Sequence, residues 1–409
     1  MRRVVITGTG VISPVGNDTR TFFDNLTSGV CGIVPISRFD TEGYRAKVAG
    51  EVQGFESEAF GIDRAQAKRM DLFAQYALAA AIQAVADSGI EGTVAPERLG
   101  VYVGAGIGGM QTFVQETEKL LSRGPSRVSP FFVPMMIGNM ASGNIAIRFN
   151  AQGPCLPVVT ACATSTHSIG EAFRAVKYGH ADAVIAGGAE ATLLPLAVAG
   201  FSNMKALSES EDPNAASLPF DARRSGFVMG EGSGIVVLEE YEHAVSRGAR
   251  IWAEVCGYGN TCDAYHITAP QEEGIGAANA FRLALDEANW QGETLYINAH
   301  GTGTPMNDKV ETLAIKRALG EEAARAALIS STKSMTGHML GAAGAVEAIA
   351  SAMALKEGVV PPTIHLEKSD PACDLNYVPN SAVRADVTMA LSSSLGFGGH
   401  NAVIAMRKI

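Results

Sequence analysis

The chain has 409 residues, too many for one ordinary core, and this length predicts two domains or two fused halves. Hydrophobic residues make up 47% of the sequence and charged residues 18%, which is typical of a well-buried globular enzyme and excludes a disordered or fibrous chain. The formal net charge of −10 argues against general nucleic-acid binding, which needs a basic surface.

The cysteines and the apolar segments bear on the compartment of the protein. The six cysteines contain no CxxC pair, and the apolar start Val4–Ile6 ends at Thr7–Gly10, too early for a signal peptide. The apolar stretch 183–201 is interrupted by Glu190 and Pro195, so it does not predict a membrane span. We therefore expect free thiols in a reducing compartment, a cytoplasmic protein, no membrane insertion and no nucleic-acid partner.

Hydrophobic periodicity predicts alternating strands and helices in the first half of the chain. In chain order, the expected elements are a strand at 3–8, a helix at 17–28, a long helix at 63–88, a strand at 99–104, a strand that ends at Thr160, a helix at 169–178 and strands at 181–190 and 234–239. Segments 33–60 and 207–220 are expected to be irregular, because they are rich in polar residues and turn formers. Segment 128–150 is rich in methionine and glycine and is expected to line a pocket or an interface.

The second half repeats the order of elements found in the first half. Its expected elements are a strand at 253–259, a helix at 276–288, strands at 295–299 and 327–331, a helix at 344–356 and a hairpin of 391–396 with 401–407. This pattern predicts an internal duplication with pseudo-two-fold symmetry, in which each half is a mixed sheet covered by helices. We place the boundary near residue 250, which gives an N-terminal half of 1–250 and a C-terminal half of 251–409.

One cysteine lies where a strand gives way to a helix. Val158-Val159-Thr160 is typical of the end of a buried strand, and the small residues after Cys162 lead into the helix. Unpaired N–H groups and the positive end of the helix dipole at this place favour a thiolate over a thiol. Cys162 is therefore a candidate nucleophile, and the alternative from this stretch alone is a buried, inert cysteine.

Glycine-rich clusters in the second half carry the other candidate residues, at 298–305, 333–338 and 396–401. His300 directly follows an apolar strand, and His338 belongs to the cluster that matches the Cys162 stretch of the first half. Flanking glycines and a strand end favour a histidine that projects into a cleft. Thr302 and Thr304 are two apart on an extended chain, which puts both hydroxyls on one side.

The other histidines and a metal site are weighed against this interpretation. A lone histidine is usually a hydrogen-bonded polar residue, and we interpret four of them in this way: His167, His180, His243 and His365. No cysteine or histidine pair has the spacing of zinc ligands, and the nearby carboxylates are isolated. We therefore expect no zinc site.

Together, these motifs resemble those of the β-ketoacyl-acyl carrier protein synthases, most closely the second type, the elongating enzyme of bacterial fatty-acid synthesis. The resemblance covers nearly the whole chain and rests on the Cys162 stretch, His300-Gly-Thr-x-Thr-Pro, Lys333-x-x-x-Gly-His338, Gly396-Phe-Gly-Gly, Pro219-Phe-Asp-x-x-Arg-x-Gly-Phe-Val228 and Gly341-Ala-Ala-Gly-Ala345. It implies an α/β protein with the thiolase fold, a five-layered αβαβα sandwich of two duplicated halves, that works as a homodimer.

The resemblance also implies a decarboxylating Claisen condensation with a Cys-His-His triad. Cys162 would take the acyl group from the carrier protein's pantetheine thioester, and the N–H groups of Cys162 and Phe397 would form the oxyanion hole. Neutral His300 and His338 would bind the thioester oxygen of malonyl-acyl carrier protein, so that loss of CO₂ leaves an enolate. The substrates carry 4′-phosphopantetheine, and no separate cofactor is expected.

Further residues take their expected roles from the same resemblance. Lys333 supplies a supporting charge and pairs with Glu347 or Glu311. The expected substrate-binding residues are Thr302, Thr304 and Thr268 for the pantetheine amides, Ile107 for the acyl tunnel, and Phe201, while Phe397 is also the gate beside the nucleophile. Carrier proteins of this pathway are acidic, and the net charge of −10 requires a local basic patch for their docking, expected at Lys68, Arg69 and Lys205.

The sequence departs from the family pattern at three places. Asn298, Glu347, Ser392 and Ser393 fall where some relatives hold a structural monovalent cation, but Ser393 replaces an asparagine, which leaves that site open. His400 stands where many members have threonine and is expected to be structural. Leu395 stands where phenylalanine is frequent, next to the gate.

Three other functions are weighed against condensation in fatty-acid elongation. A degradative thiolase needs a second cysteine in the C-terminal glycine motif, where this chain has Phe397. A non-catalytic partner subunit of the chain-length-factor kind lacks the nucleophile, whereas Cys162 is present. A polyketide ketosynthase shares all the motifs and remains the alternative. The sequence leaves acyl chain length and unsaturation open.

Overall fold

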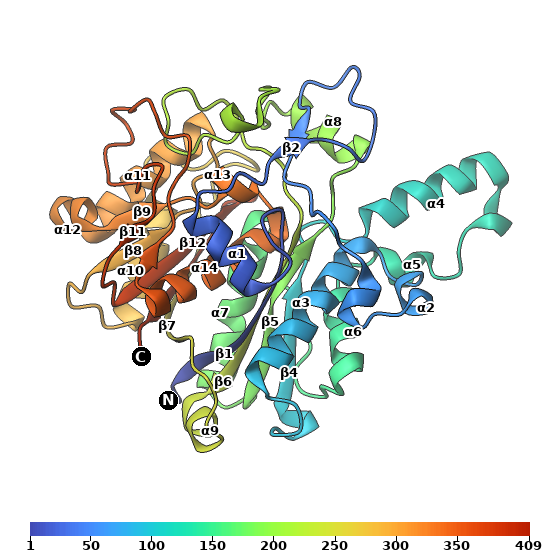
Figure 1. Ribbon diagram of the computed structural model, residues 1–409, viewed down its shortest axis with the longest axis horizontal. Coiled ribbons are helices and arrows are strands. Elements are labelled where there is room, and N and C mark those ends of the chain that lie inside the picture. Colours follow the sequence, from blue (N-terminus) through green and yellow to red (C-terminus); the bar gives the residue numbers. More distant parts are fainter.

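A nine-stranded mixed sheet runs through the computed structural model, which describes residues 1–409 (Figure 1). From one edge to the other its strands are β4 (Leu99–Gly104), β5 (Ala183–Glu190), β6 (Gly232–Glu240), β1 (Val4–Ile12), β7 (Ala253–Cys262), β13 (His400–Arg407), β12 (Met389–Gly396), β8 (Leu295–Asn298) and β9 (Leu328–Ser330). Two small strand pairs lie outside it, β2 (Val34–Pro35) with β3 (Val48–Ala49) and β10 (Val359–Val360) with β11 (Val383–Arg384).

The strand order is the same in both directions from the middle of the sheet. A short antiparallel pairing of Val4–Ile6 with Ala253–Val255 joins β1 to β7. Outward from this junction, β6, β5 and β4 on one side correspond to β13, β12 and β8 on the other. Beyond β4, a parallel bridge between Val101 and Cys155 takes the place of β9. The predicted duplication with pseudo-two-fold symmetry is thereby confirmed, while the division at residue 250 stays a prediction.

Helices cover both faces of each half-sheet and produce five layers. The four that define the layers are α3 (Leu72–Ser88), α7 (Thr164–Lys177), α10 (Ile275–Glu287) and α14 (Ala343–Glu357). The α3 helix packs against β1, β5 and β6 on one outer face, and α10 packs against β7 and β13 on the other. The α7 and α14 helices contact each other between the two half-sheets, where the largest hydrophobic core lies. The thiolase-like αβαβα sandwich is therefore confirmed.

Paired glycines explain how the outer helices approach the sheet so closely. A Cβ on Gly8 or Gly10 of β1 would lie 2.1 or 2.0 Å from a carbonyl oxygen of α3, a distance that no side chain tolerates. In the second half, a Cβ on Gly257 or Gly259 of β7 would lie 2.1 or 1.8 Å from a carbonyl oxygen of α10. The same Gly-x-Gly pattern thus serves the same packing in both halves.

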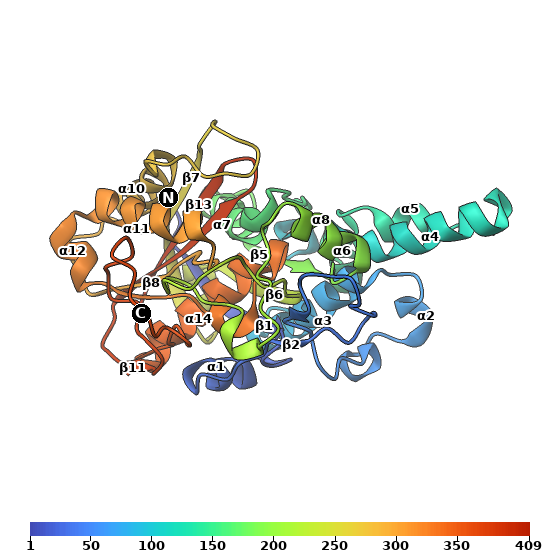
Figure 2. The ribbon, with the colours of Figure 1, turned by 90° about the horizontal axis from the view of Figure 1, so that it is seen from above.

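The remaining helices surround this frame. They are α1 (Thr19–Thr27), α2 (Arg64–Ala67), α4 (Met110–Arg123), α5 (Phe132–Met136), α6 (Met140–Phe149), α8 (Pro195–Asn203), α9 (Tyr241–Ser246), α11 (Pro305–Leu319), α12 (Glu321–Ala326) and α13 (Lys333–Thr336). Figure 2 shows that α4 and α5 form an arm, residues 110–136, that projects from the body of the molecule. None of the helices combines the length and the apolar character needed to cross a bilayer.

Several sequence-based boundaries are wrong. The strands expected to end at residues 8 and 259 continue to Ile12 and Cys262. The helix expected at 63–88 is two helices, because Asp71 caps α3 and its Oδ2 accepts hydrogen bonds from Thr112 N and Oγ1 at 2.8 and 2.6 Å. The helix expected from residue 169 begins at Thr164, since its first turn packs on α14, with Ala345 N donating to Ser165 Oγ at 2.9 Å. The strand expected to end at Thr160 is reduced to a bridge at Cys155, followed by a segment without regular secondary structure.

Candidate active site

The nucleophile candidate lies in a tight turn between the half-sheets. A short 3₁₀ helix, η4 (Ala161–Ala163), directly precedes α7 and places Cys162 at the start of that helix. Ala161 has a φ of 50°, a left-handed conformation that is strained for a residue with a Cβ. Thr160 N donates to Thr164 Oγ1 at 2.9 Å and fixes the turn from the other side. The backbone on either side of Cys162 is thus fixed, and the residue is only 8% exposed.

One cavity of about 780 Å³ brings the predicted catalytic and substrate-binding residues together. Cys162 comes from the first half of the chain, whereas both candidate histidines come from the second. Nine of the predicted site residues line this cavity: Cys162, Phe201, Lys205, Thr268, His300, Thr302, Thr304, His338 and Phe397. Both halves of the chain therefore contribute side chains to one site.

The two histidines form a pair with free side-chain nitrogens. Their rings are 5.3 Å apart between centroids and lie at 86° to each other. Backbone bonds position them, because His300 N donates to Glu311 Oε1 and His338 N donates to Val228 O, both at 2.7 Å. His300 Nδ1 and both ring nitrogens of His338 are buried without a hydrogen-bond partner. Buried unpaired nitrogens of this kind are suited to a substrate oxygen.

The histidines are neutral at physiological pH. Burial lowers the pKa of His300 and of His338 well below 6.5, and the nearby Lys333 ammonium lowers both further. A neutral imidazole has one N–H donor, so each ring can donate one hydrogen bond to an oxygen that gains negative charge. The direction of both pKa shifts agrees with the expectation of neutral donors.

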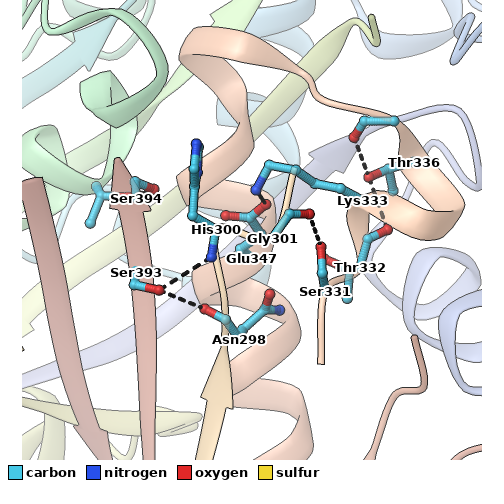
Figure 3. A network of polar contacts seen from close by, with 12 residues as sticks. Asn298, His300, Gly301, Ser331, Thr332, Lys333, Thr336, Glu347, Ser393 and Ser394 are labelled. Atoms are coloured by element: carbon cyan, nitrogen blue, oxygen red, sulfur yellow. Dashed lines mark hydrogen bonds and ion pairs between the residues drawn. The ribbon is translucent and has the colours of Figure 1, made fainter. Parts of the chain in front are cut away.

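Lys333 does not line the cavity and forms a buried ion pair. Its Nζ donates to Glu347 Oε1, and both side chains are only 1% exposed (Figure 3). Burial raises the pKa of Glu347 to about 7, while the Lys333 charge opposes that rise. Of the two partners left open by the sequence, Glu347 is therefore the one that pairs, and Glu311 instead accepts from His300 N and Gly301 N.

The thiol of Cys162 differs from the sequence-based expectation. Burial raises its pKa to about 11, although the Lys333 charge and the Phe397 N–H group both act to lower it. The helix N-terminus had favoured a thiolate, but the loss of solvent around the sulfur outweighs that effect. Cys162 therefore rests as a thiol, with the Phe397 N–H directed at its sulfur.

The Thr302 and Thr304 loop is fixed by residues that the sequence analysis did not identify. Their hydroxyls lie 3.0 Å apart, as their spacing predicts. Buried Asp308 accepts from Gly303 N at 3.2 Å, and Arg224 Nε donates to Thr304 O at 3.2 Å. Arg224 belongs to the Pro219–Val228 motif, which could have identified it.

Comparison with known proteins decides the family. Residues 1–244 match the model of the "Beta-ketoacyl synthase, N-terminal domain", and residues 252–367 match that of the C-terminal domain. The chain belongs to the β-ketoacyl synthase family.

Curated relatives and solved structures agree over the whole chain. It is 52% identical over 409 residues to 3-oxoacyl-[acyl-carrier-protein] synthase 2 of Staphylococcus aureus, covering 100% of this chain and 98% of the relative. The 3-oxoacyl-[acyl-carrier-protein] synthase 2 of Synechocystis is 51% identical over 410 residues, with the same coverage. The ishigamide ketosynthase/chain length factor superposes with a TM-score of 0.92 at 39% identity, over 100% of this chain and 99% of that one. A β-ketoacyl synthase from Burkholderia phymatum superposes with a TM-score of 0.92 at 34% identity, over 100% of both chains.

Three of the four residues expected to hold a monovalent cation in this β-ketoacyl synthase have unpaired polar atoms. Asn298 and Ser392 are register partners on β8 and β12. The side-chain amide of Asn298, the Ser392 hydroxyl and Glu347 Oε2 are all buried without a hydrogen-bond partner. Ser393 differs, because its hydroxyl donates to Glu311 Oε1 at 2.9 Å. The unpaired oxygens suit a hard cation, and no cluster of three His, Cys, Asp or Glu side chains offers a transition-metal site.

Besides Lys333, three predicted residues of this synthase lie outside the cavity. Lys68 and Arg69 follow α2 on the surface, where the Arg69 guanidinium lies 5.1 Å from the centre of the Phe131 ring on the arm. Ile107 does not line the cavity, and its side chain is 46% exposed. The docking roles of Lys68 and Arg69 and the acyl-tunnel role of Ile107 stay predictions.

Proposed function

We propose that this protein is a 3-oxoacyl-acyl carrier protein synthase of the second type. It condenses malonyl-acyl carrier protein with an acyl chain bound to Cys162, giving 3-oxoacyl-acyl carrier protein and CO₂ in fatty-acid elongation. The observation that carries the proposal is one cavity lined by Cys162 and by two neutral histidines, His300 and His338, whose buried ring nitrogens have no hydrogen-bond partner.

The first half-reaction loads the acyl group. The Cys162 sulfur forms a bond to the thioester carbonyl carbon, and the N–H groups of Cys162 and Phe397 stabilise the oxyanion. The bond between that carbon and the pantetheine sulfur then breaks. The departing pantetheine sulfur takes up the proton that Cys162 loses, so the step needs no separate base. This route suits a nucleophile that rests as a thiol.

The second half-reaction makes the carbon–carbon bond. His300 and His338 donate hydrogen bonds to the malonyl thioester oxygen, and the bond to the carboxylate breaks as its electron pair forms the enolate. The enolate carbon attacks the acyl-Cys162 carbonyl, the carbon–sulfur bond breaks, and the released thiolate takes a proton from solvent. Burial and the Lys333 charge keep both histidines neutral, and Glu347 balances the charge of Lys333. A cation held by Asn298, Ser392 and Glu347 would add a fixed positive charge behind the histidine loop.

The partner that fits this site is an acyl carrier protein in its acyl and malonyl forms. Thr302, Thr304 and Thr268 line the cavity that the pantetheine arm would enter, and exposed Lys205 lies at its edge. A solved structure that resembles this chain at 34% identity, with a TM-score of 0.91, is titled as a type II polyketide acyl-carrier protein in complex with its ketosynthase. Exposed Lys68 and Arg69 supply positive charge for an acidic carrier.

A homodimer is supported by an open sheet edge. Segment 154–160 bonds to β4 on one side, through Val101 N to Pro154 O at 2.9 Å and Leu156 N to Val101 O at 3.0 Å. Its other side has no strand partner, and Leu156 and Val159 are 53% and 60% exposed. An exposed apolar edge of this kind favours pairing with a second copy. The cytoplasmic location remains a prediction.

Polyketide extension is the alternative function, since a type II polyketide ketosynthase shares the fold at 34% identity. The higher identity of 52% to the synthase 2 of fatty-acid elongation favours elongation. An extension assay with malonyl-acyl carrier protein and a series of acyl-carrier proteins tests it. We expect a single two-carbon extension for each acceptor. Repeated extension without reduction would instead assign polyketide synthesis, and no extension would refute both.

A further inference from the structure

A buried carboxylate that the proposed mechanism does not use lies next to the nucleophile. Glu190 is the last residue of β5, and its side chain is 0% exposed. No basic side chain forms an ion pair with it, so its charge is compensated only by backbone N–H groups. A carboxylate is rarely buried without a specific task, because its desolvation costs free energy.

Glu190 joins segments from both halves of the chain. Its Oε2 accepts hydrogen bonds from Gly106 N at 2.8 Å and from Gly341 N at 3.1 Å, and its Oε1 accepts from Ile107 N at 3.3 Å. Gly106 and Ile107 form the loop after β4, whereas Gly341 lies in η6 (Leu340–Ala342), the 3₁₀ turn before α14.

The packing around this carboxylate leaves no room for larger residues. A Cβ on Gly106 would lie 2.5 Å from Glu190 Oε2 and 3.6 Å from Ala161 O, in the nucleophile turn. A Cβ on Gly341 would lie 2.3 Å from Gly106 N. The loop after β4, the turn of Cys162 and the turn of Gly341 therefore meet at Glu190.

The charge of Glu190 also acts on the thiol. Burial has the largest effect on the pKa of the Cys162 thiol and raises it; of the charged side chains nearby, the Lys333 ammonium lowers that pKa and the Glu190 carboxylate raises it. The two histidines of the cavity are neutral and add no charge. Burial raises the pKa of Glu190 itself to about 7, against the stabilising effect of its N–H donors.

We propose that Glu190 is a positioning residue of the condensing site, which holds the Gly106–Ile107 loop and Gly341 beside the Cys162 turn and whose charge restrains the reactivity of the free thiol. The role in the condensing site rests on the proposed function, but the effect on the thiol does not require turnover. Two variants separate the parts of this proposal. Glu190→Gln removes the charge and keeps an oxygen for Gly106 and Gly341, whereas Glu190→Asp keeps the charge and withdraws it from the loop.

The charge is tested by the rate at which iodoacetamide alkylates Cys162, followed by mass spectrometry of its peptide between pH 7 and 9. We expect Glu190→Gln to be alkylated about threefold faster, because loss of the charge lowers the pKa of the thiol and raises its thiolate fraction, while the more acidic thiol is a weaker nucleophile. The control is Glu51→Gln, another buried carboxylate bonded to a backbone N–H and a hydroxyl, here of Ser37. An unchanged rate in Glu190→Gln overturns the electrostatic role.

The loop is tested by the extension rates of Glu190→Asp on acyl-carrier proteins of increasing chain length. We expect the alkylation rate to stay within about twofold of the unmodified protein and the preference among chain lengths to shift. An unaltered preference overturns the positioning role. If the unmodified protein does not condense at all, the proposed function fails, and the alkylation arm still decides whether Glu190 restrains the thiol.

Discussion

Ala161 and Leu340 adopt the same left-handed backbone conformation at equivalent points of the two halves, with φ of 50° and 48°. Each residue opens a three-residue 3₁₀ turn, η4 or η6, that leads directly into a central helix, α7 or α14. A strained conformation that occurs twice reflects the shared geometry of both halves, and in the first half that geometry presents the nucleophile.

Substitutions at Ala161 should show whether its left-handed backbone conformation is strained. Ala161→Gly relieves about 1 kcal/mol of left-handed strain and loses a similar amount to the flexibility of glycine, so the free energy of unfolding should hardly change. Ala161→Val should lower it by about 2 kcal/mol, because a β-branched residue tolerates this φ poorly. Urea denaturation measures the free energy of unfolding of both variants. Equal stability of the two would show that the backbone at Ala161 is not strained.

Cys162→Ala should abolish condensation and leave part of the malonyl-thioester decarboxylation. Acyl loading needs the sulfur, whereas loss of CO₂ needs mainly the two histidines. The measurement is release of labelled CO₂ alongside 3-oxoacyl product, with Cys373→Ala as the control, a buried cysteine outside the cavity. Retained elongation would remove Cys162 from its role.

His338→Ala should reduce decarboxylation more than acyl transfer. The ring nitrogens of His338 are free to bind the malonyl oxygen. During acyl loading, the proton that Cys162 loses can go to the leaving pantetheine sulfur. We expect the decarboxylation rate to fall by about 10² or more, the effect of removing one oxyanion donor. Separate single-turnover assays of loading and CO₂ release check this. An equal loss in both would make His338 the base for the thiol.

Alkylation of Cys162 should accelerate with pH without a plateau near neutrality. A pKa of about 11 means that the protonated form dominates below that pH, so the thiolate fraction rises tenfold for each pH unit. The rate with iodoacetamide should therefore climb about tenfold per unit from pH 7 to 9. A plateau beginning below pH 8 would show that the helix N-terminus outweighs burial.

Lys68→Glu combined with Arg69→Glu should raise the KM for acyl-carrier protein substrates. The pair should leave activity on acyl-CoA or acyl-pantetheine surrogates nearly unchanged, because both side chains lie outside the cavity. Steering by exposed charge is screened beyond about 8 Å at physiological ionic strength, so the difference should shrink as salt rises. Equal losses on both kinds of substrate would place docking elsewhere.

Much of the fold was predictable because it depends on local patterns. The strand-to-turn-to-helix pattern around Cys162 and the glycine flanks of His300 and His338 singled out these three residues, and the family resemblance predicted that they meet in one site, as they do in the cavity. The break between α2 and α3 was not predictable, because it depends on Asp71 bonding to Thr112, 41 residues away. The choice of Glu347 for Lys333 and the raised pKa of the thiol likewise depend on packing between distant segments.

The alignment of the two central turns pairs Cys162 with Gly341. Gly341 leaves no room for a side chain, since a Cβ there would lie 2.3 Å from Gly106 N. The copy that carries the histidines therefore has no side chain at the position where the other copy carries its sulfur. The two duplicated halves therefore contribute different reacting groups to the site, and neither half alone holds a complete set.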